Sequence, residues 1–138
     1  MNSLTKIFIA EQDCESLVNT MLWLEQYADF EVYGTAQTDS SLTDQIEEMQ
    51  PDVVIFGVAG AAAQVTMAIK AIRSTSSSPA VMVVSRNDVN VDSLAAEADG
   101  QIGPRTGLKD VPELIQKAVN RRRLSAIATK AVPMAKAG

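Results

Sequence analysis

Carboxylates are the groups in this sequence whose types and positions could do chemistry. Glu11 and Asp13 follow the first apolar run of the chain, and Asp52 precedes another. Such groups can hold Mg²⁺ together with substrate oxygens, or accept a transferred group as a covalent intermediate. The chain has no histidine and one cysteine, Cys14, which excludes a disulfide, a Cys/His zinc site and His-based acid–base chemistry within it. Most reactions of small enzymes are thereby excluded.

Five apolar runs, each followed by a segment with helical spacing, position these groups. Residues 53–56 are consecutively apolar between a Pro-Asp entry and a glycine, which is typical of a strand buried on both faces of a parallel sheet. We expect strands at 6–10, 30–36, 53–56, 80–84 and 101–103. A helix is expected at 61–73, and others where apolar positions recur with helical spacing over 17–28, 42–49, 91–98 and from 111 onward. This alternation predicts a doubly wound α/β domain with a five-stranded parallel sheet in the flavodoxin-like order 2-1-3-4-5.

Helix packing follows from the spacing of apolar residues. In the first helix, Leu17 and Met21 belong to a stripe that faces the sheet, and Val18 and Leu22 are expected to widen it. Trp23 and Tyr27, four residues apart and off the main stripe, are expected either to face a partner or to cover the margin of the sheet.

The expected strand order brings some of the candidate groups together. Ligands of open α/β sheets bind beyond the carboxyl ends of the strands, where the order reverses, so Glu11, Gln12 and Gly57 should share one crevice. Asp52 lies at the other end of its strand, about 17 Å away. Asp13 is expected to cap the following helix. The crevice therefore contains a glycine where a reactive side chain would be expected.

Four stretches within residues 1–120 carry a family resemblance: Lys-Ile-Phe-Ile-Ala-Glu-Gln-Asp at 6–13, Pro-Asp-Val-Val-Ile-Phe-Gly at 51–57, Pro-Ala-Val-Met-Val-Val-Ser-Arg at 79–86 and Ala-Asp-Gly at 98–100. In their order and spacing they resemble the receiver domain of response regulators in two-component phosphorelay signalling. In that family two acidic residues hold Mg²⁺, an aspartate accepts the phosphoryl group, and a Ser or Thr and a lysine complete the site.

The resemblance can be followed position by position. The corresponding residues are Glu11, Gln12, Gly57, Val84, Ser85, Pro104 and Arg105. The first acidic residue is kept. The second acidic position holds the neutral Gln12, and the acceptor position holds Gly57. The hydroxyl position holds Val84, followed by Ser85, and the lysine position holds Pro104, followed by Arg105. Because a glycine cannot form an aspartyl phosphate, the resemblance implies a pseudo-receiver that is not an enzyme and has neither a metal nor a cofactor.

Typical receivers pair through the face made by the fourth helix, the fifth strand and the fifth helix. By resemblance, a homodimer face here would include Val91, Ala95, Gln101, Arg105 and Lys109. We therefore expect a phosphorylation-independent interaction or dimerisation module. The chain is also similar to the amino-terminal part of the pilus-assembly ATPases of tight-adherence systems, where such a domain helps to localise and dimerise the protein. The alternative is a small-ligand or anion sensor that uses the crevice near Glu11, Gln12, Gly57 and Ser85.

Charge divides the chain near residue 120. The net charge of −5 is the sum of −10 over residues 1–120 and +5 over residues 121–138. An acidic body disfavours nucleic-acid binding. Residues 121–123 are three arginines, expected at the carboxyl end of the last helix, where they would complement its dipole rather than touch acidic lipid or nucleic acid.

The domain organisation follows from length and composition. At 138 residues and 46% hydrophobic composition, we expect one receiver-like domain over 1–120, followed over 121–138 by a helix extension and a basic, alanine-rich linker or tail. No secretory leader opens the sequence, and its longest uncharged run is too short and too interrupted for a membrane helix. We therefore expect a cytoplasmic protein without membrane insertion.

Overall fold

The computed structural model describes residues 4–11, 13–35, 41–58, 62–76, 78–85, 98–102, 106 and 108–136. Its strands are β1 (Thr5–Ala10), β2 (Phe30–Thr35), β3 (Val53–Val58), β4 (Ala80–Ser85) and β5 (Gly100–Ile102). They form one parallel sheet in the order β2-β1-β3-β4-β5, which confirms the predicted fold class and strand order. The described helices are α1 (Cys14–Leu24), α2 (Ser41–Met49), α3 (Ala62–Arg73) and α5 (Val111–Lys136), and a short 3₁₀ turn, Leu108–Asp110, precedes α5. The helix expected at 91–98 falls almost wholly outside the described residues.

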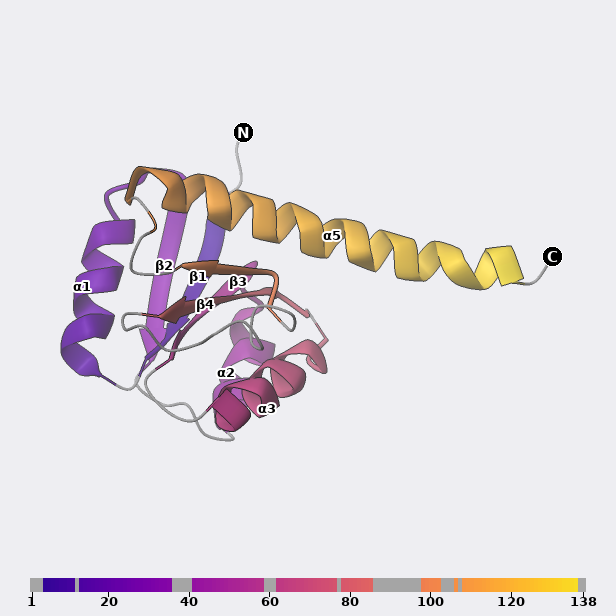
Figure 1. Cartoon of the computed structure of the whole chain (residues 1–138), viewed down its shortest axis with the longest axis horizontal. Coiled ribbons are helices and arrows are strands. Elements are labelled where there is room, and N and C mark those ends of the chain that lie inside the picture. Colours follow the sequence, from indigo (N-terminus) through magenta and orange to yellow (C-terminus); the bar gives the residue numbers. More distant parts are fainter. Residues whose placement is uncertain are drawn as a thin grey trace.

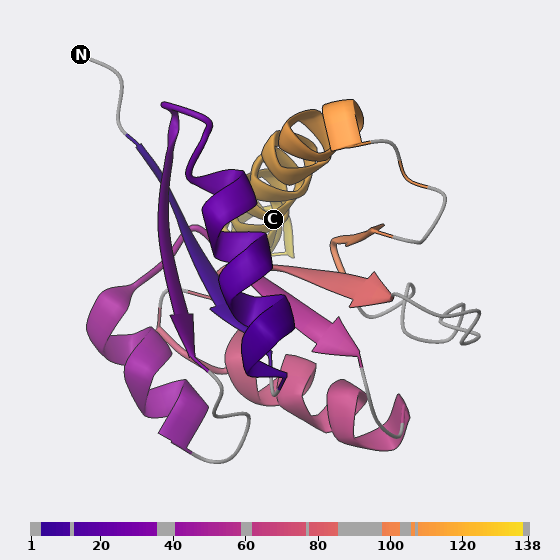
Figure 2. The same ribbon diagram turned by 90° about the vertical axis from the view of Figure 1, so that its left-hand side faces the viewer.

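Both faces of the sheet are covered, α2 and α3 lying on one side and α1 and α5 on the other (Figures 1 and 2). Alternate residues of each central strand feed the two cores. Phe8, Val54 and Val81 pack with α2 and α3, while Ile7, Ile55 and Met82 pack with α1 and α5. Because side chains alternate across a strand and both faces are buried, the central strands are continuous apolar runs.

The margin of the sheet beside α1 is closed by aromatic residues. Trp23 and Tyr27 are half-buried against the α1–α5 core, with their rings in an edge-to-face arrangement at 6.4 Å between centroids. Tyr27 also contacts Phe30 of β2, at 5.8 Å between ring centroids. These contacts support the interpretation that the two residues cover the sheet margin.

The outer side of α1 differs from the prediction. Val18 and Leu22 are 51% and 59% exposed, so the expectation that both widen the buried stripe is wrong. A helix packed on one sheet buries only the arc that faces it. Leu17 and Leu24 provide that arc.

The last helix runs well past the sheet. α5 has 26 residues, and only its first half packs on the body, through Val111, Ile115, Ala118 and Val119 (Figure 1). The three arginines at 121–123 lie inside the helix, so the dipole explanation is wrong, because that effect is confined to the last turn. The linker-like residues 124–136 are helical. Within the described ranges, no helix has the length and apolarity that a membrane span requires.

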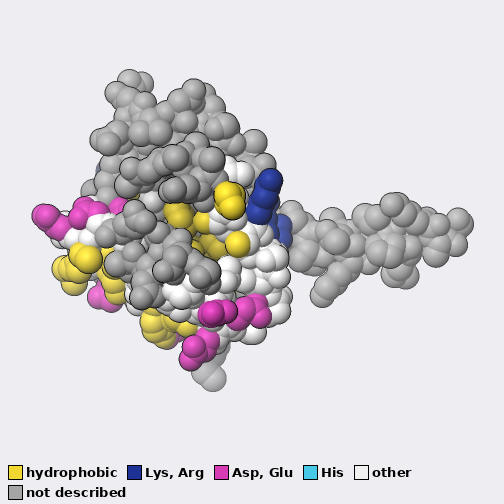
Figure 3. Space-filling model, turned by 90° about the horizontal axis from the view of Figure 1, so that it is seen from below, with side chains coloured by type: hydrophobic (Ala, Val, Ile, Leu, Met, Phe, Trp, Pro, Cys, Tyr) yellow, Lys and Arg dark blue, Asp and Glu magenta, His cyan; other side chains and the backbone are white. Residues whose placement is uncertain are grey.

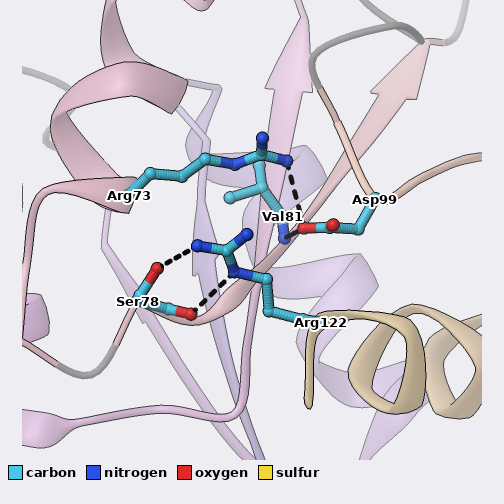
Figure 4. Close-up of polar contacts among 5 residues, drawn as sticks. All are labelled: Arg73, Ser78, Val81, Asp99 and Arg122. Carbon is cyan, nitrogen blue, oxygen red and sulfur yellow. Dashed lines mark hydrogen bonds and ion pairs between the residues drawn. The ribbon is translucent and has the colours of Figure 1, made fainter. Parts of the chain in front are cut away.

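Two of the arginines anchor α5 to the amino-terminal edge of the sheet. The Arg122 Nε donates to the Ser78 carbonyl at 3.2 Å, and its Nη2 donates to the Ser78 hydroxyl (Figure 4). The Arg123 guanidinium lies 3.6 Å from the Asp52 carboxylate. The basic cluster therefore has a structural role where the helix leaves the body.

Candidate functional site

Strand register brings three of the predicted site residues together. Ala10 of β1 pairs with Phe56 of β3, so Glu11, the next residue, lies beside Gly57. On the other side Gly57 pairs with Val84 of β4. All three residues therefore meet where the central strands end, at the edge marked by the arrowheads in Figure 2. The predicted convergence of Glu11 and Gly57 is confirmed.

The Glu11 side chain occupies the space above Gly57. A Cβ atom at position 57 would lie 2.5 Å and 2.7 Å from the two carboxylate oxygens of Glu11 and 2.6 Å from its Cδ. Glu11 is only 2% exposed, and its backbone amide donates to the Thr35 carbonyl of β2 at 3.0 Å. Position 57 has no side chain, and the neighbouring carboxylate fills the room for one.

The other acidic candidates are engaged elsewhere. Asp13 is the N-cap residue of α1, as expected, and its carbonyl accepts from the Leu17 amide at 2.9 Å. Its carboxylate accepts a hydrogen bond from the Ser16 hydroxyl at 2.5 Å and makes no side-chain cap bond to the helix. Asp52 lies at the amino-terminal edge, where its carboxylate accepts from the Lys6 amide at 2.8 Å. In the part of the chain that the structure describes, no three His, Cys, Asp or Glu side chains gather as metal ligands would.

Of the remaining predicted site positions, the structure describes Val84 and Ser85. Val84, half-buried opposite Gly57, has no hydroxyl to contact a phosphoryl group. Ser85 ends β4, and Gln12, Pro104 and Arg105 lie outside the described residues. The described part of this edge thus brings one buried carboxylate, a glycine and an aliphatic side chain together, with no aspartate at position 57.

The predicted pairing face is described only in part. Gln101 of β5 and Lys109 of the 3₁₀ turn are exposed, as an interface residue must be. Val91, Ala95 and Arg105 lie outside the described residues. Among the described residues, β5 is a three-residue strand at the edge of the sheet, paired with β4.

Sequence reasoning missed the contact between the Glu11 carboxylate and Gly57, and also the exposed pair on α1. The contact between Glu11 and Gly57 could have been predicted, because a glycine on one strand leaves room for the long side chain of a glutamate that follows the neighbouring strand. The exposed pair had a weaker signal, because Val18 and Leu22 lie at the border of the helical stripe, where spacing alone does not separate buried from exposed positions.

No protein-family model matches this chain, and no curated protein matches it. Several solved structures share its fold. A LuxR-family DNA-binding response regulator from Staphylococcus aureus superposes with a TM-score of 0.70 at 19% identity, over 84% of this chain and 99% of that one. A CheY-like receiver domain protein from Methanospirillum hungatei JF-1 gives 0.69 at 24% identity, over 89% and 99%. A protein from Burkholderia pseudomallei K96243 described as pilus assembly-related gives 0.70 at 13% identity, over 87% and 92%.

These likenesses, with the strand order, show that the chain has the fold of the response-regulator receiver domain.

Proposed function

We propose that this domain is a pseudo-receiver, a non-enzymatic signalling module that binds protein partners without being phosphorylated. One observation carries the proposal: the Glu11 carboxylate lies where a side chain at Gly57 would have to be. A receiver changes its binding surfaces when its aspartate is phosphorylated. Because Gly57 cannot be phosphorylated, the partner-binding surface of this domain does not switch between two states. Its affinity for partners is therefore independent of phosphodonors.

The partner surface of this proposal is the face made by the helix expected at 91–98, β5 and α5, on which two copies pair. Exposed Gln101 and Lys109 border it, and Val91, Ala95 and Arg105 complete it. In the part of the chain that the structure describes, β5 is the last strand of the sheet, and edge strands are sites where another chain can add. In the proposed homodimer, the two copies therefore contact each other at the β5 edge of the sheet and along the first half of α5.

The setting we propose is the cytoplasm, in signalling or in the localisation of a pilus-assembly complex. The likeness to the pilus assembly-related protein of Burkholderia pseudomallei supports the second setting, since the two chains share a fold over most of their lengths. The same proposal includes no nucleic-acid contact by the acidic body and no insertion into a membrane.

An anion sensor in the Gly57 crevice is the weaker alternative. The buried Glu11 carboxylate fills the room above Gly57 and would repel an anion there. A cavity of ≈ 210 Å³ does lie at the opposite edge of the sheet, with Arg122 and Arg123 in its lining, but these arginines already bind Ser78 and Asp52. A thermal-shift screen with phosphate, nucleotides and Mg²⁺ tests the alternative, because a ligand at 100 times its dissociation constant would stabilise the fold by about 2.7 kcal/mol.

Sedimentation velocity over a range of concentrations tests the proposed function. We expect a dimer whose dissociation constant is the same with and without acetyl phosphate and Mg²⁺. Lys109→Glu should weaken the dimer, whereas Lys70→Glu, an equally charge-reversing change at an exposed position of α3, should not. Association that appears only with the phosphodonor, or a monomer at every concentration, contradicts the proposal.

A further inference from the structure

α5 carries two apolar faces that point in nearly opposite directions. Val111, Ile115 and Ala118 are buried against the sheet, and Arg122, one turn further along the same face, bonds to Ser78. In the second half, apolar residues recur with spacings of three and four, at Leu124, Ile127, Ala131 and Met134. At 3.6 residues per turn, these positions lie about half a turn from the first face.

The second face is therefore not a continuation of the first. Leu124 is 66% exposed, which agrees with a face turned away from the body of its own domain. We call residues 121–136 the α5 extension; it runs beyond the body at the end opposite α1 (Figure 1). Apolar residues at this spacing on one face of a helix are typical of a face that packs on something else.

Charge limits what that partner surface can be. Every charged residue of the extension is basic: Arg121, Arg122, Arg123, Lys130 and Lys136. Two extensions packed side by side would bring these like charges together, which is unfavourable. The complementary surface must combine apolar side chains with carboxylates.

The outer side of α1 has these properties. Val18 and Leu22, one helical turn apart, are both exposed. Exposed Glu15 lies three residues before Val18, and exposed Glu25, the C-cap residue, lies three residues after Leu22. α1 contains no basic residue. We call these four residues the α1 face. Figure 3 shows exposed hydrophobic side chains beside acidic ones at the left flank of the molecule, where Figure 1 places α1.

We propose that the α5 extension of one copy docks on the α1 face of a second copy, with the side of the helix that carries Leu124 against Val18 and Leu22. An extension cannot reach the α1 face of its own chain, because the two lie at opposite ends of the molecule (Figure 1). The contact joins two different surfaces, so it can repeat from copy to copy and build a row. It goes beyond the proposed function and uses surfaces other than the β5–α5 pairing face.

Two variants that each keep one half of the contact test this directly. Leu22→Glu removes the α1 face and leaves the extension, whereas the double change Leu124→Glu and Ile127→Glu does the reverse. Leu22 and Leu124 are mostly exposed, so the fold should tolerate their changes. Met67→Glu is the matched control, because Met67 is 71% exposed on α3, on the other side of the sheet.

In sedimentation velocity at rising concentration, the wild type and Met67→Glu should associate beyond a dimer. Each half-contact variant should lose this growth, with self-association through the contact weakened at least tenfold. An equimolar mixture of the two should form complexes larger than any that either variant forms alone, and higher salt should weaken them. If the mixture shows no complex beyond those of its components, the proposal is overturned.

The same data separate this proposal from the β5–α5 dimer. Suppose that a dimer persists in both half-contact variants, that Lys109→Glu weakens it, and that the mixture forms no new complex. The proposed function is then supported and docking on α1 is not. Another outcome would overturn docking on α1. If the wild type shows no self-association but binds phosphatidylserine vesicles, and the double change Leu124→Glu and Ile127→Glu abolishes that binding, the second face is assigned to a membrane.

Discussion

The carboxylate of Glu11 lies over the Cα of Gly57, in the space that a side chain at position 57 would enter. Parallel register explains the contact, because Glu11 directly follows the β1 residue that pairs with Phe56. The absence of a side chain at position 57 is thus matched by a neighbour that uses the room. An aspartate introduced at position 57 would require Glu11 to move.

A methyl group added at Gly57 should therefore destabilise the fold. Gly57→Ala is expected to lower the free energy of unfolding by about 1–3 kcal/mol, the usual cost of adding atoms to a packed site. Gly100→Ala is the matched control in another strand, since its Cβ would meet no described atom closer than 3.4 Å. Urea denaturation measures both, and equal effects would contradict the packing account.

The same change should cost less when Glu11 is shortened. In a Glu11→Ala background, Gly57→Ala adds its methyl group to space that the carboxylate has left. A double-mutant cycle on the unfolding free energies should give a coupling of about 0.5–3 kcal/mol, as is usual for residues in contact. Strict additivity of the two changes would show that the carboxylate does not fill this space.

Much of this architecture followed from the sequence. The unbroken apolar runs at 53–56 and 80–84 predicted central strands, and the parallel order placed Glu11 beside Gly57. The direction of the Glu11 side chain could not be predicted, because strand alternation fixes where Cβ points but not where three further torsions carry a carboxylate. The three arginines at 121–123 looked like a helix end because basic residues favour that place, and an alanine-rich continuation is equally compatible with a helix.

Arg122 should stabilise the attachment of α5. Arg122→Ala removes two hydrogen bonds to Ser78, and we expect a loss of about 1.5–3 kcal/mol in unfolding free energy, typical of bonds from a charged group. Arg121→Ala, at the exposed neighbouring position, should change it by less than about 0.5 kcal/mol. Chemical denaturation of the two variants side by side makes the comparison, and similar losses would rule out the anchoring role.

Asp99 ties α3 to β4 (Figure 4). Its carboxylate accepts from the Val81 amide at 2.9 Å and from the Arg73 Nη2 at 3.3 Å. Asp99→Ala leaves the buried Val81 amide without this acceptor, which should cost about 1–3 kcal/mol. Asp99→Asn keeps an acceptor oxygen and should cost less in thermal or urea unfolding. An asparagine variant as unstable as the alanine variant would show that the ion pair dominates.

Tyr33 should lose its proton at a higher pH than an ordinary tyrosine, because its pKa is raised. Its hydroxyl donates to the Glu31 carboxylate, and this hydrogen bond, with smaller contributions from burial and from the negative charge, raises the pKa of Tyr33. The contact therefore stabilises the fold below pH ~10, where an unfolded tyrosine is still protonated, and this stabilisation is lost as the pH rises through the pKa of the folded state. Glu31→Ala should lower the Tyr33 pKa, followed through its ring signals by NMR. An unchanged titration would show that Glu31 is not the cause.

Intact-mass spectrometry after incubation with acetyl phosphate and Mg²⁺ tests the central claim most directly, with a receiver domain that has its aspartate as the positive control. The account predicts no mass increase for this chain under conditions that modify the control. An increase of one phosphoryl group that maps to this edge of the sheet, on Glu11 or on any other residue, would contradict it.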